Sequence, residues 1–158
     1  MSDKKEAGAL KVPARVIHAF IETSLLALKL AATDAAKIAE LMTEADLTGA
    51  DAHGIFRLPQ YVKRVKDGGF NPHPNITVTK NSAATALVDG DNGFGHLVMS
   101  RVAETAISLA RETGVAWVGA RRSNHAGPAG LYAAMPIEHG MACIYTAVAN
   151  ANHMAIWG

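Results

Sequence analysis

The sequence contains very little cysteine and almost no net charge. Cys143 is the only cysteine among the 158 residues, so no disulfide can form within the chain, and its apolar neighbours predict a buried, inert thiol typical of a reducing cytoplasm. Fifteen basic and fourteen acidic residues are scattered along the chain, which gives no electrostatic attraction to nucleic acid or to an anionic membrane surface. We therefore expect a cytoplasmic protein with neither nucleic acid nor a membrane as its partner.

Long apolar runs are also absent. The N-terminal stretch MSDKKEAGALK is polar, and the more apolar segment after it is interrupted by Arg15, His18, Glu22 and Lys29. Polar and charged residues at those positions predict neither a membrane-spanning helix nor the core of a signal peptide. With 49% hydrophobic and 18% charged residues, the composition is that of a globular protein long enough to bury a substantial core.

The first third of the sequence has the apolar periodicity of helices. One amphipathic helix is predicted over about 13–29, beginning at a proline, and a second is predicted from Thr33, as its cap, to Gly49. Pro59 costs no helical hydrogen bond only in the first turn of a helix, so a third helix is predicted over about 57–67.

After the segment GGFNPHPN the pattern changes to short apolar runs separated by turn residues. It predicts two strands joined by a turn at Asn81 and Ser82, then a helix, a strand, a second helix and a last strand. The order β, β, α, β, α, β indicates an α+β, or mixed α/β, fold beside a helical unit. The predicted elements cover about residues 76–80, 84–90, 92–114, 115–120, 128–139 and 141–149.

This change of pattern divides the chain into three parts. They are a polar N-terminal tail over residues 1–12, a helical unit over 13–75 and the first part of a mixed α/β domain over 76–158. The chain stops directly after a predicted inner strand and its loop, without a final covering element. We therefore expect a fragment whose mixed α/β domain is incomplete at the C-terminus.

One histidine lies where α/β proteins commonly keep catalytic groups. His125, in the segment SNHAGPAG, falls in the loop between a predicted buried strand and a helix that begins at Pro128. The small residues around it would allow a ligand to approach the imidazole closely. The alternative is a turn histidine that donates one hydrogen bond to a carbonyl group, and the spacing does not decide between them.

A second candidate site lies in the segment LTGADAHGIFRLPQYVKRV. Arg57 and Tyr61 are one helical turn apart and share a face, and His53 precedes them in the approach to the helix. A guanidinium beside a phenol suits a carboxylate, and a nearby imidazole could exchange a proton with an oxygen on the adjacent carbon. The alternative is an amphipathic edge beside an apolar stripe, with Arg57 paired to Asp46 or Asp51.

Two other kinds of site have weaker signals. The segment DGDNGFGH follows a strand and precedes a helix, as a phosphate-binding loop would, but its glycines do not form the dinucleotide fingerprint G-x-G-x-x-G, and a tight turn is the alternative. The sequence has seven histidines but no H-E-x-x-H motif and no cysteine partner for them, so no metal site is predicted. The histidines expected at the surface or at helix ends are His18, His73, His96 and His139.

Four segments together resemble one known family. They are ADLTGADAHGIFRLPQYVKRVKDGGFNPHPN, ALVDGDNGFGH, ARETGVAWVGARRSNHAG and ANHMAIWG. Their succession resembles the second type of NAD(P)-dependent malate and L-lactate dehydrogenases, whose relatives include ureidoglycolate dehydrogenase, sulfolactate dehydrogenase and diketogulonate reductase. The resemblance covers nearly all of the chain after the polar tail, and the motifs H-G-x-x-R-x-P-x-Y and S-N-H-x-G occur in the family order.

The resemblance implies a fold and a reaction. The family is not Rossmann-folded: its members combine a helical unit with a mixed α/β nicotinamide-binding domain, and they usually form homodimers. They use NAD or NADP to interconvert small 2-oxo and 2-hydroxy acids by hydride transfer. By position, one of His53 and His125 would be the acid–base group on the substrate oxygen. Arg57 and Tyr61 would hold the substrate carboxylate, and Asn150 would belong to the cofactor site.

The chain departs from the family pattern in two ways. Ala52 stands where the family usually has a serine before the first histidine, which leaves the identity of the acid open. Family chains are also considerably longer. A truncated, inactive remnant of the family, or an interaction module derived from it, is therefore the alternative to an enzyme.

Overall fold

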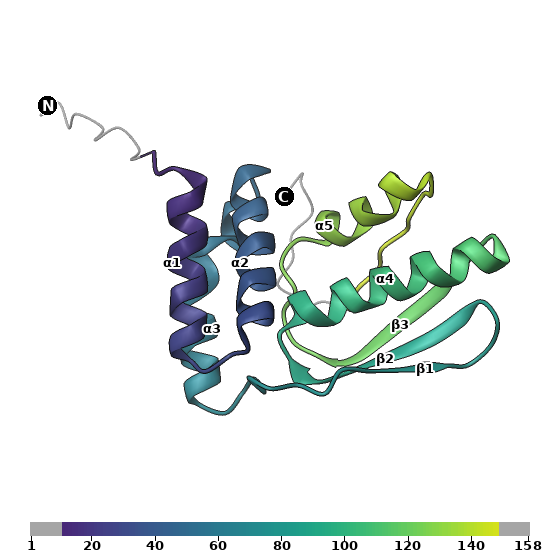
Figure 1. Ribbon diagram of the computed structural model, residues 1–158, viewed down its shortest axis with the longest axis horizontal. Helices are drawn as coiled ribbons and strands as arrows, with labels where there is room; N and C mark the ends of the chain where they lie inside the picture. Colours follow the sequence, from purple (N-terminus) through teal and green to yellow (C-terminus); the bar gives the residue numbers. More distant parts are fainter. Residues whose placement is uncertain (1–10, 149–158) are drawn as a thin grey trace, which may run out of the picture. The chain divides into compact units, whose positions relative to one another are not determined.

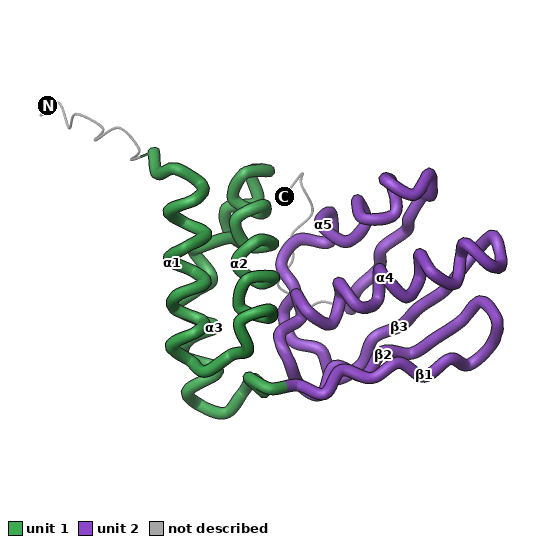
Figure 2. The backbone as a smooth tube through the Cα atoms, viewed as in Figure 1, with its two compact units in different colours: residues 1–73 green, residues 74–158 purple. Residues whose placement is uncertain are grey.

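The computed structural model describes residues 11–148 (Figure 1). The chain divides between His73 and Pro74 into two compact units, which Figure 2 shows in green and purple. One unit is helical and the other contains a mixed sheet, so the predicted mixed α/β fold class is confirmed. Within the described residues, no helix combines the length and the apolar character needed to cross a membrane.

The first unit consists of helices and short 3₁₀ turns, and it confirms the three predicted helices. Its elements are α1 (Ala14–Ala27), α2 (Ala32–Leu47), η1 (Asp51–His53), η2 (Ile55–Arg57) and α3 (Leu58–Lys66). The helices share one core because residues three and four apart lie on the same helix face. Fully buried side chains of α1 and α2 in this core are Ile21, Leu25, Ala35, Ile38, Ala39, Met42 and Ala45.

Two details of this unit differ from the prediction. Thr33 does not cap α2, because Ala31 has the extended backbone of the capping position and the helix already begins at Ala32. In α3 the buried side chains are Leu58 and Tyr61. The apolar spacing of Ile55, Leu58, Val62 and Val65 predicts Val62 in the core as well, but Val62 is only half-buried. A phenol ring is apolar over most of its surface, so it can take a core position that the apolar pattern assigns to its neighbour.

The second unit contains a three-stranded sheet with α4 on one face. Its elements are β1 (Thr77–Lys80), β2 (Thr85–Gly93), α4 (Gly95–Thr113), β3 (Trp117–Ser123), α5 (Ala129–Ala134) and η3 (Met135–His139). The strands β1 and β2 form the predicted antiparallel hairpin, and β3 runs parallel to β2 after α4. Figure 1 shows α4 lying along the sheet, where Val88, Val98 and Val102 form a buried cluster.

The end of the second unit departs from the prediction. The predicted helix over 128–139 is split into α5 and η3, and Pro136, which lacks an N–H group, lies in the 3₁₀ part. Residues 141–148 form no strand, because an apolar run becomes a strand only where a neighbour supplies hydrogen bonds. The strand β3, expected to be buried, is largely exposed, and Trp117 is 65% exposed.

Cys143 is exposed, so the expectation of a buried, inert thiol is wrong. The expectation assumed that the segment around it forms an inner strand, and that strand does not form. We therefore expect DTNB to titrate one thiol per native chain as fast as it does in denaturant. The Cys143→Ser variant is the blank, and a native thiol that reacts only after unfolding would contradict the exposed position.

Candidate functional site

The strands β2 and β3 lose their regular register at one end. Asp89 pairs with Arg121, but the next pair is Gly93 with Ser123, so four steps along β2 match two steps along β3. Extra residues in one strand bend it and re-aim the chain that follows. The bend lies directly before the loop that contains the S-N-H-x-G motif.

Three residues at this bend have left-handed backbone conformations without being glycine. The φ angles of Asp91, Asn92 and Arg122 are 47°, 58° and 49°. Each such residue costs about 1–2 kcal/mol, least for aspartate and asparagine, whose short side chains can hydrogen-bond locally. Arg122 has no such local compensation, so other contacts have to hold its conformation.

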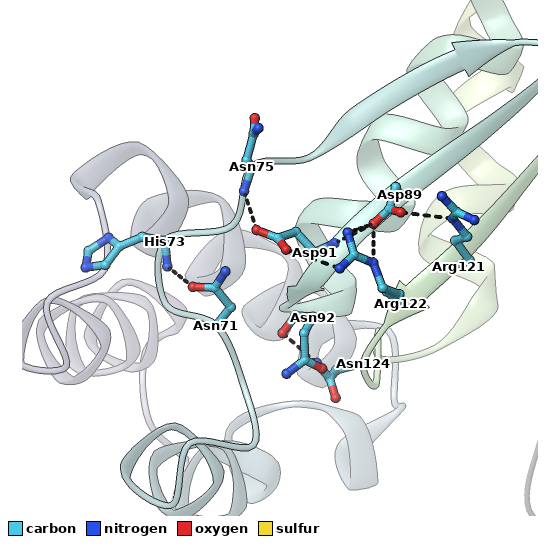
Figure 3. A network of polar contacts seen from close by, with 9 residues as sticks. All are labelled: Asn71, His73, Asn75, Asp89, Asp91, Asn92, Arg121, Arg122 and Asn124. Carbon is cyan, nitrogen blue, oxygen red and sulfur yellow. Dashed lines mark hydrogen bonds and ion pairs between the residues drawn. The ribbon is translucent and has the colours of Figure 1, made fainter.

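The carboxylate of Asp89 supplies those contacts (Figure 3). Its Oδ2 accepts a hydrogen bond from Nε of Arg121 at 2.9 Å, and its Oδ1 accepts from Nε of Arg122 at 2.7 Å. The Nη2 atom of Arg122 lies 2.6 Å from the same oxygen, and the backbone N–H of Asp91 donates to it at 3.0 Å. The Asp91 carboxylate in turn accepts from the N–H of Asn75. One carboxylate thus ties both strands together at the bend.

These contacts make stability depend on pH. Hydrogen bonds from Arg122 and from the N–H of Asp91 hold the pKa of the Asp89 carboxyl below its ordinary value of 3.8. The carboxylate therefore stabilises the fold above that pH, and the contribution is lost as the pH falls through the lower, folded-state pKa. We expect Asp89→Asn to melt below the parent chain at pH 7, with the difference shrinking as the pH falls below 3.8. A difference that stays constant as the pH falls, measured in thermal melts, would contradict the assignment.

The loop that contains His125 lies against the start of α4. The amide Nδ2 of Asn124 donates to the carbonyl oxygens of Asn92, at 2.8 Å, and of Gly93, at 3.0 Å. A Cβ atom at Gly95 would lie 2.1 Å from the carbonyl oxygen of Asn124 and 2.6 Å from that of His125. Only glycine at position 95 lets the loop backbone come this close.

The ring of His125 is half-buried and accepts a hydrogen bond from the backbone. Its Nδ1 accepts from the N–H of Gly127 at 3.3 Å, so the proton of the neutral ring lies on Nε2. A Cβ at Gly127 would lie 3.2 Å from Nε2 of His96. His96, expected at the surface or a helix end, is in the first turn of α4 but fully buried, because this loop covers it.

The glycines of the segment DGDNGFGH allow other parts of the second unit to pack closely against its backbone. A Cβ at Gly90 would meet Val98 and the carbonyl oxygen of Arg122, and one at Gly93 would meet Pro74, each within 3 Å. The backbone of the chain's own loop lies against Gly95, where a phosphate would have to bind. This arrangement favours the tight-turn interpretation of DGDNGFGH over the phosphate-binding one.

In the first unit, His53 lies in η1 and is half-buried. The next residue, Gly54, sits against Asp46 of α2, whose Oδ1 would be 1.8 Å from a Cβ at position 54. The Oδ2 atom of Asp46 accepts a hydrogen bond from the N–H of Ile55 at 2.9 Å. The glycine of the H-G motif is thus explained by the close approach of this turn to α2, which places His53 beside the start of α3.

Arg57 forms an ion pair with neither Asp46 nor Asp51, so the pairing expected in the alternative interpretation is wrong. Its Nε donates to the carbonyl oxygen of Ala52 at 2.8 Å, and its Nη1 donates to Oε1 of Gln60 at 2.8 Å. Burial raises the pKa of Tyr61, and the charge of the nearby Arg57 partly opposes that rise. The phenol therefore stays protonated as a donor close to a guanidinium that no carboxylate of the described residues neutralises.

The candidate residues fall in both units. His53, Arg57 and Tyr61 belong to the first unit and His125 to the second, while Asn150 lies outside the described residues. A cavity of about 500 Å³ in the second unit lies between α4, β3 and residues 140–146, and none of these side chains lines it. Over residues 11–148, no three histidine, cysteine or acidic side chains are grouped so that they could hold a metal ion.

Comparison with known proteins identifies related sequences. A family model described as malate/L-lactate dehydrogenase matches residues 12–158. Malate dehydrogenase of Pyrococcus horikoshii is 42% identical over 132 residues, which are 84% of this chain and 37% of that relative. L-sulfolactate dehydrogenase of Methanocaldococcus jannaschii is 43% identical over 108 residues, which are 68% of this chain and 31% of that relative.

Solved structures show the same relationship. The structure of malate dehydrogenase from Pyrococcus horikoshii OT3 matches with a TM-score of 0.80 and 42% identity, over 84% of this chain and 38% of that one. Sulfolactate dehydrogenase from Methanocaldococcus jannaschii matches with a TM-score of 0.79 and 36% identity, over 82% of this chain and 38% of that one. The chain thus spans well under half the length of the relatives that it matches.

Proposed function

The chain belongs to the malate/L-lactate dehydrogenase family, and we propose that it contributes the acid–base and carboxylate-binding residues of an oxidoreductase that transfers a hydride between a nicotinamide cofactor and a small 2-hydroxy or 2-oxo acid. The family match carries the proposal, because residues 12–158 include both candidate segments. One of His53 and His125 exchanges the proton of the substrate oxygen. Arg57 and Tyr61 hold the carboxylate.

The chemistry of these side chains fits a nicotinamide cofactor. An imidazole can give or take a proton and a guanidinium can hold a carboxylate, but neither supplies two electrons, so bound NAD or NADP supplies the hydride. Asn150 is the residue proposed to contact the cofactor, by its position in the family pattern.

The proposed mechanism follows the charge that develops on the substrate. When a 2-oxo acid is reduced, negative charge grows on the carbonyl oxygen, and a protonated imidazole gives its proton to that oxygen as the charge forms, which leaves a neutral ring. The neutral ring of His125 has its proton on Nε2, because Nδ1 accepts from Gly127, so this ring acts as the acid after it takes up a second proton. The guanidinium of Arg57 and the protonated phenol of Tyr61 both donate to the carboxylate, which fixes the orientation of the acid.

Arg57→Lys is expected to raise the KM for the acid by about tenfold and to change kcat less. Lysine keeps the positive charge but loses the two-nitrogen fork, and with it the bond from Nε to the carbonyl oxygen of Ala52. Steady-state kinetics with varied acid concentration measures the effect. Arg101→Lys, on an exposed part of α4, is the matched control. An unchanged KM would remove Arg57 from carboxylate binding.

A panel of 2-oxo acids with NADH and NADPH tests the proposed function. Loss of reduced-cofactor absorbance is measured for the 158-residue chain and for a fusion in which the Pyrococcus horikoshii relative supplies the length beyond its match. We expect turnover of at least one acid by the fusion. The alternative, an inactive remnant or an interaction module, predicts a cooperative melt without turnover in either protein.

The same resemblance supports proposals about the setting of the protein. We propose a homodimer in the cytoplasm that acts on small molecules, with neither nucleic acid nor a membrane as partner. The near balance of fifteen basic and fourteen acidic residues supports the last point. Light scattering of the purified protein measures the oligomeric state, and a monomer at micromolar concentration would contradict the dimer.

A further inference from the structure

We propose that Asp89 is a positioning residue for His125: its carboxylate holds the left-handed turn at Arg122 that directs the following loop onto the start of α4. The inference rests on the proposed function for its meaning in catalysis. The structural part of the inference is that Asp89 controls the position of the His125 ring and which of its nitrogens is protonated. That part depends only on contacts within the second unit.

The first step is the anchor. The Asp89 side chain is only 13% exposed, although both arginines that contact it are more than half exposed. Both of its oxygens are occupied, Oδ2 by Arg121 and Oδ1 by Arg122 and the N–H of Asp91. A largely buried carboxylate with several charge-assisted bonds is far better defined than an exposed ion pair.

The second step is the turn. Arg122 has a φ of 49°, which a side chain with a Cβ rarely adopts. Its guanidinium is held by Asp89 and lies 3.6 Å from Asp91, while its carbonyl oxygen packs against the Cα of Gly90. Because the guanidinium and the carbonyl oxygen of Arg122 are both held, the direction in which the chain leaves β3 is determined.

The third step is transmission to the histidine. Only Ser123 separates Arg122 from Asn124, whose amide is held by the carbonyl oxygens of Asn92 and Gly93. The carbonyls of Asn124 and His125 then lie against Gly95 without room for a Cβ. Because the backbone of Asn124 and His125 is in close contact with the start of α4, a shift at Arg122 moves the backbone of His125 and its Nδ1 bond to Gly127.

The test is NMR of the 158-residue chain without cofactor or acid. In Asp89→Asn the charge is lost while the shape is kept. We expect the ¹⁵N chemical shifts of the two His125 ring nitrogens to converge, because the Nε2-protonated form is no longer the only one. We also expect the amide hydrogen of Gly127 to exchange with solvent about tenfold faster or more. Glu104→Gln removes an exposed carboxylate on α4 and is expected to change neither readout.

An intact amide spectrum in Asp89→Asn with unchanged His125 ring shifts and unchanged Gly127 exchange would overturn the proposal. If that variant does not fold, Arg122→Lys, which keeps the charge but loses the fork, replaces it, with the same expected and contradicting results. The readouts need no catalysis. Absence of turnover with every 2-oxo acid would therefore contradict the proposed function but not this inference. Unchanged NMR readouts would contradict this inference but not the proposed function.

Discussion

Replacing His125 with alanine is expected to lower the turnover of a 2-oxo acid by about 10²- to 10⁴-fold, the contribution typical of a positioned acid–base group. A protonated imidazole at position 125 gives its proton to the developing oxyanion, and alanine has no group that can do so. Single-turnover oxidation of NADH or NADPH in the fusion protein isolates the chemical step.

The matched control for this experiment is His18→Ala, since His18 lies on α1 and contacts only Glu22 among the ion pairs of the described residues. Its turnover should equal that of the parent. Normal turnover in His125→Ala would remove this residue from the acid–base role, and a loss confined to His53→Ala would assign the proton to His53. The affinity for the acid should change little in either case, because the carboxylate is held by other side chains.

Replacing Gly95 with alanine is expected to cost about 3 kcal/mol or more in the free energy of unfolding. A Cβ there would lie 2.1 Å from one backbone carbonyl oxygen and 2.6 Å from the next, and backbone atoms cannot turn aside as a side chain does. For a chain of this length such a loss lowers the melting temperature by roughly 6–12 °C. Thermal or denaturant unfolding of the 158-residue chain measures it.

Gly130→Ala provides the control, since a Cβ at Gly130 would meet nothing within 4 Å and the residue lies in α5 with no left-handed φ. Alanine there should be neutral or slightly stabilising, because it favours the helix. If Gly95→Ala were as stable as the parent, the loop with His125 could not lie as closely on α4 as the structure has it, and the positioning of that histidine would lose its basis.

Local pattern was sufficient for the regular elements. Three helices, the hairpin and α4 with its glycine stop at Gly114 were all predictable, because apolar periodicity and end signals act within a few residues. The predictions that were wrong concern burial and pairing: the exposed Cys143, the largely exposed β3 and the missing strand over 141–148. Burial and strand pairing depend on neighbours distant in sequence, which a local pattern does not contain.

The candidate site divides in the same way. The residue types of His53, Arg57, Tyr61 and His125 were recognisable from their motifs, and their roles remain predictions. No sequence signal pointed to Asp89, because a lone aspartate after an apolar strand is ordinary, and its importance comes from two arginines 32 and 33 residues further on. The arginine pair next to the S-N-H-x-G motif is compatible with a carboxylate on a neighbouring strand, but it does not say which one.

By itself, the sequence determined where the helices and the hairpin form, because those preferences depend on spacing and end residues within single segments. Only the tertiary structure decided which glycines are required, which histidine is buried and which carboxylate anchors the loop, since each of these depends on two backbone segments meeting at van der Waals distance.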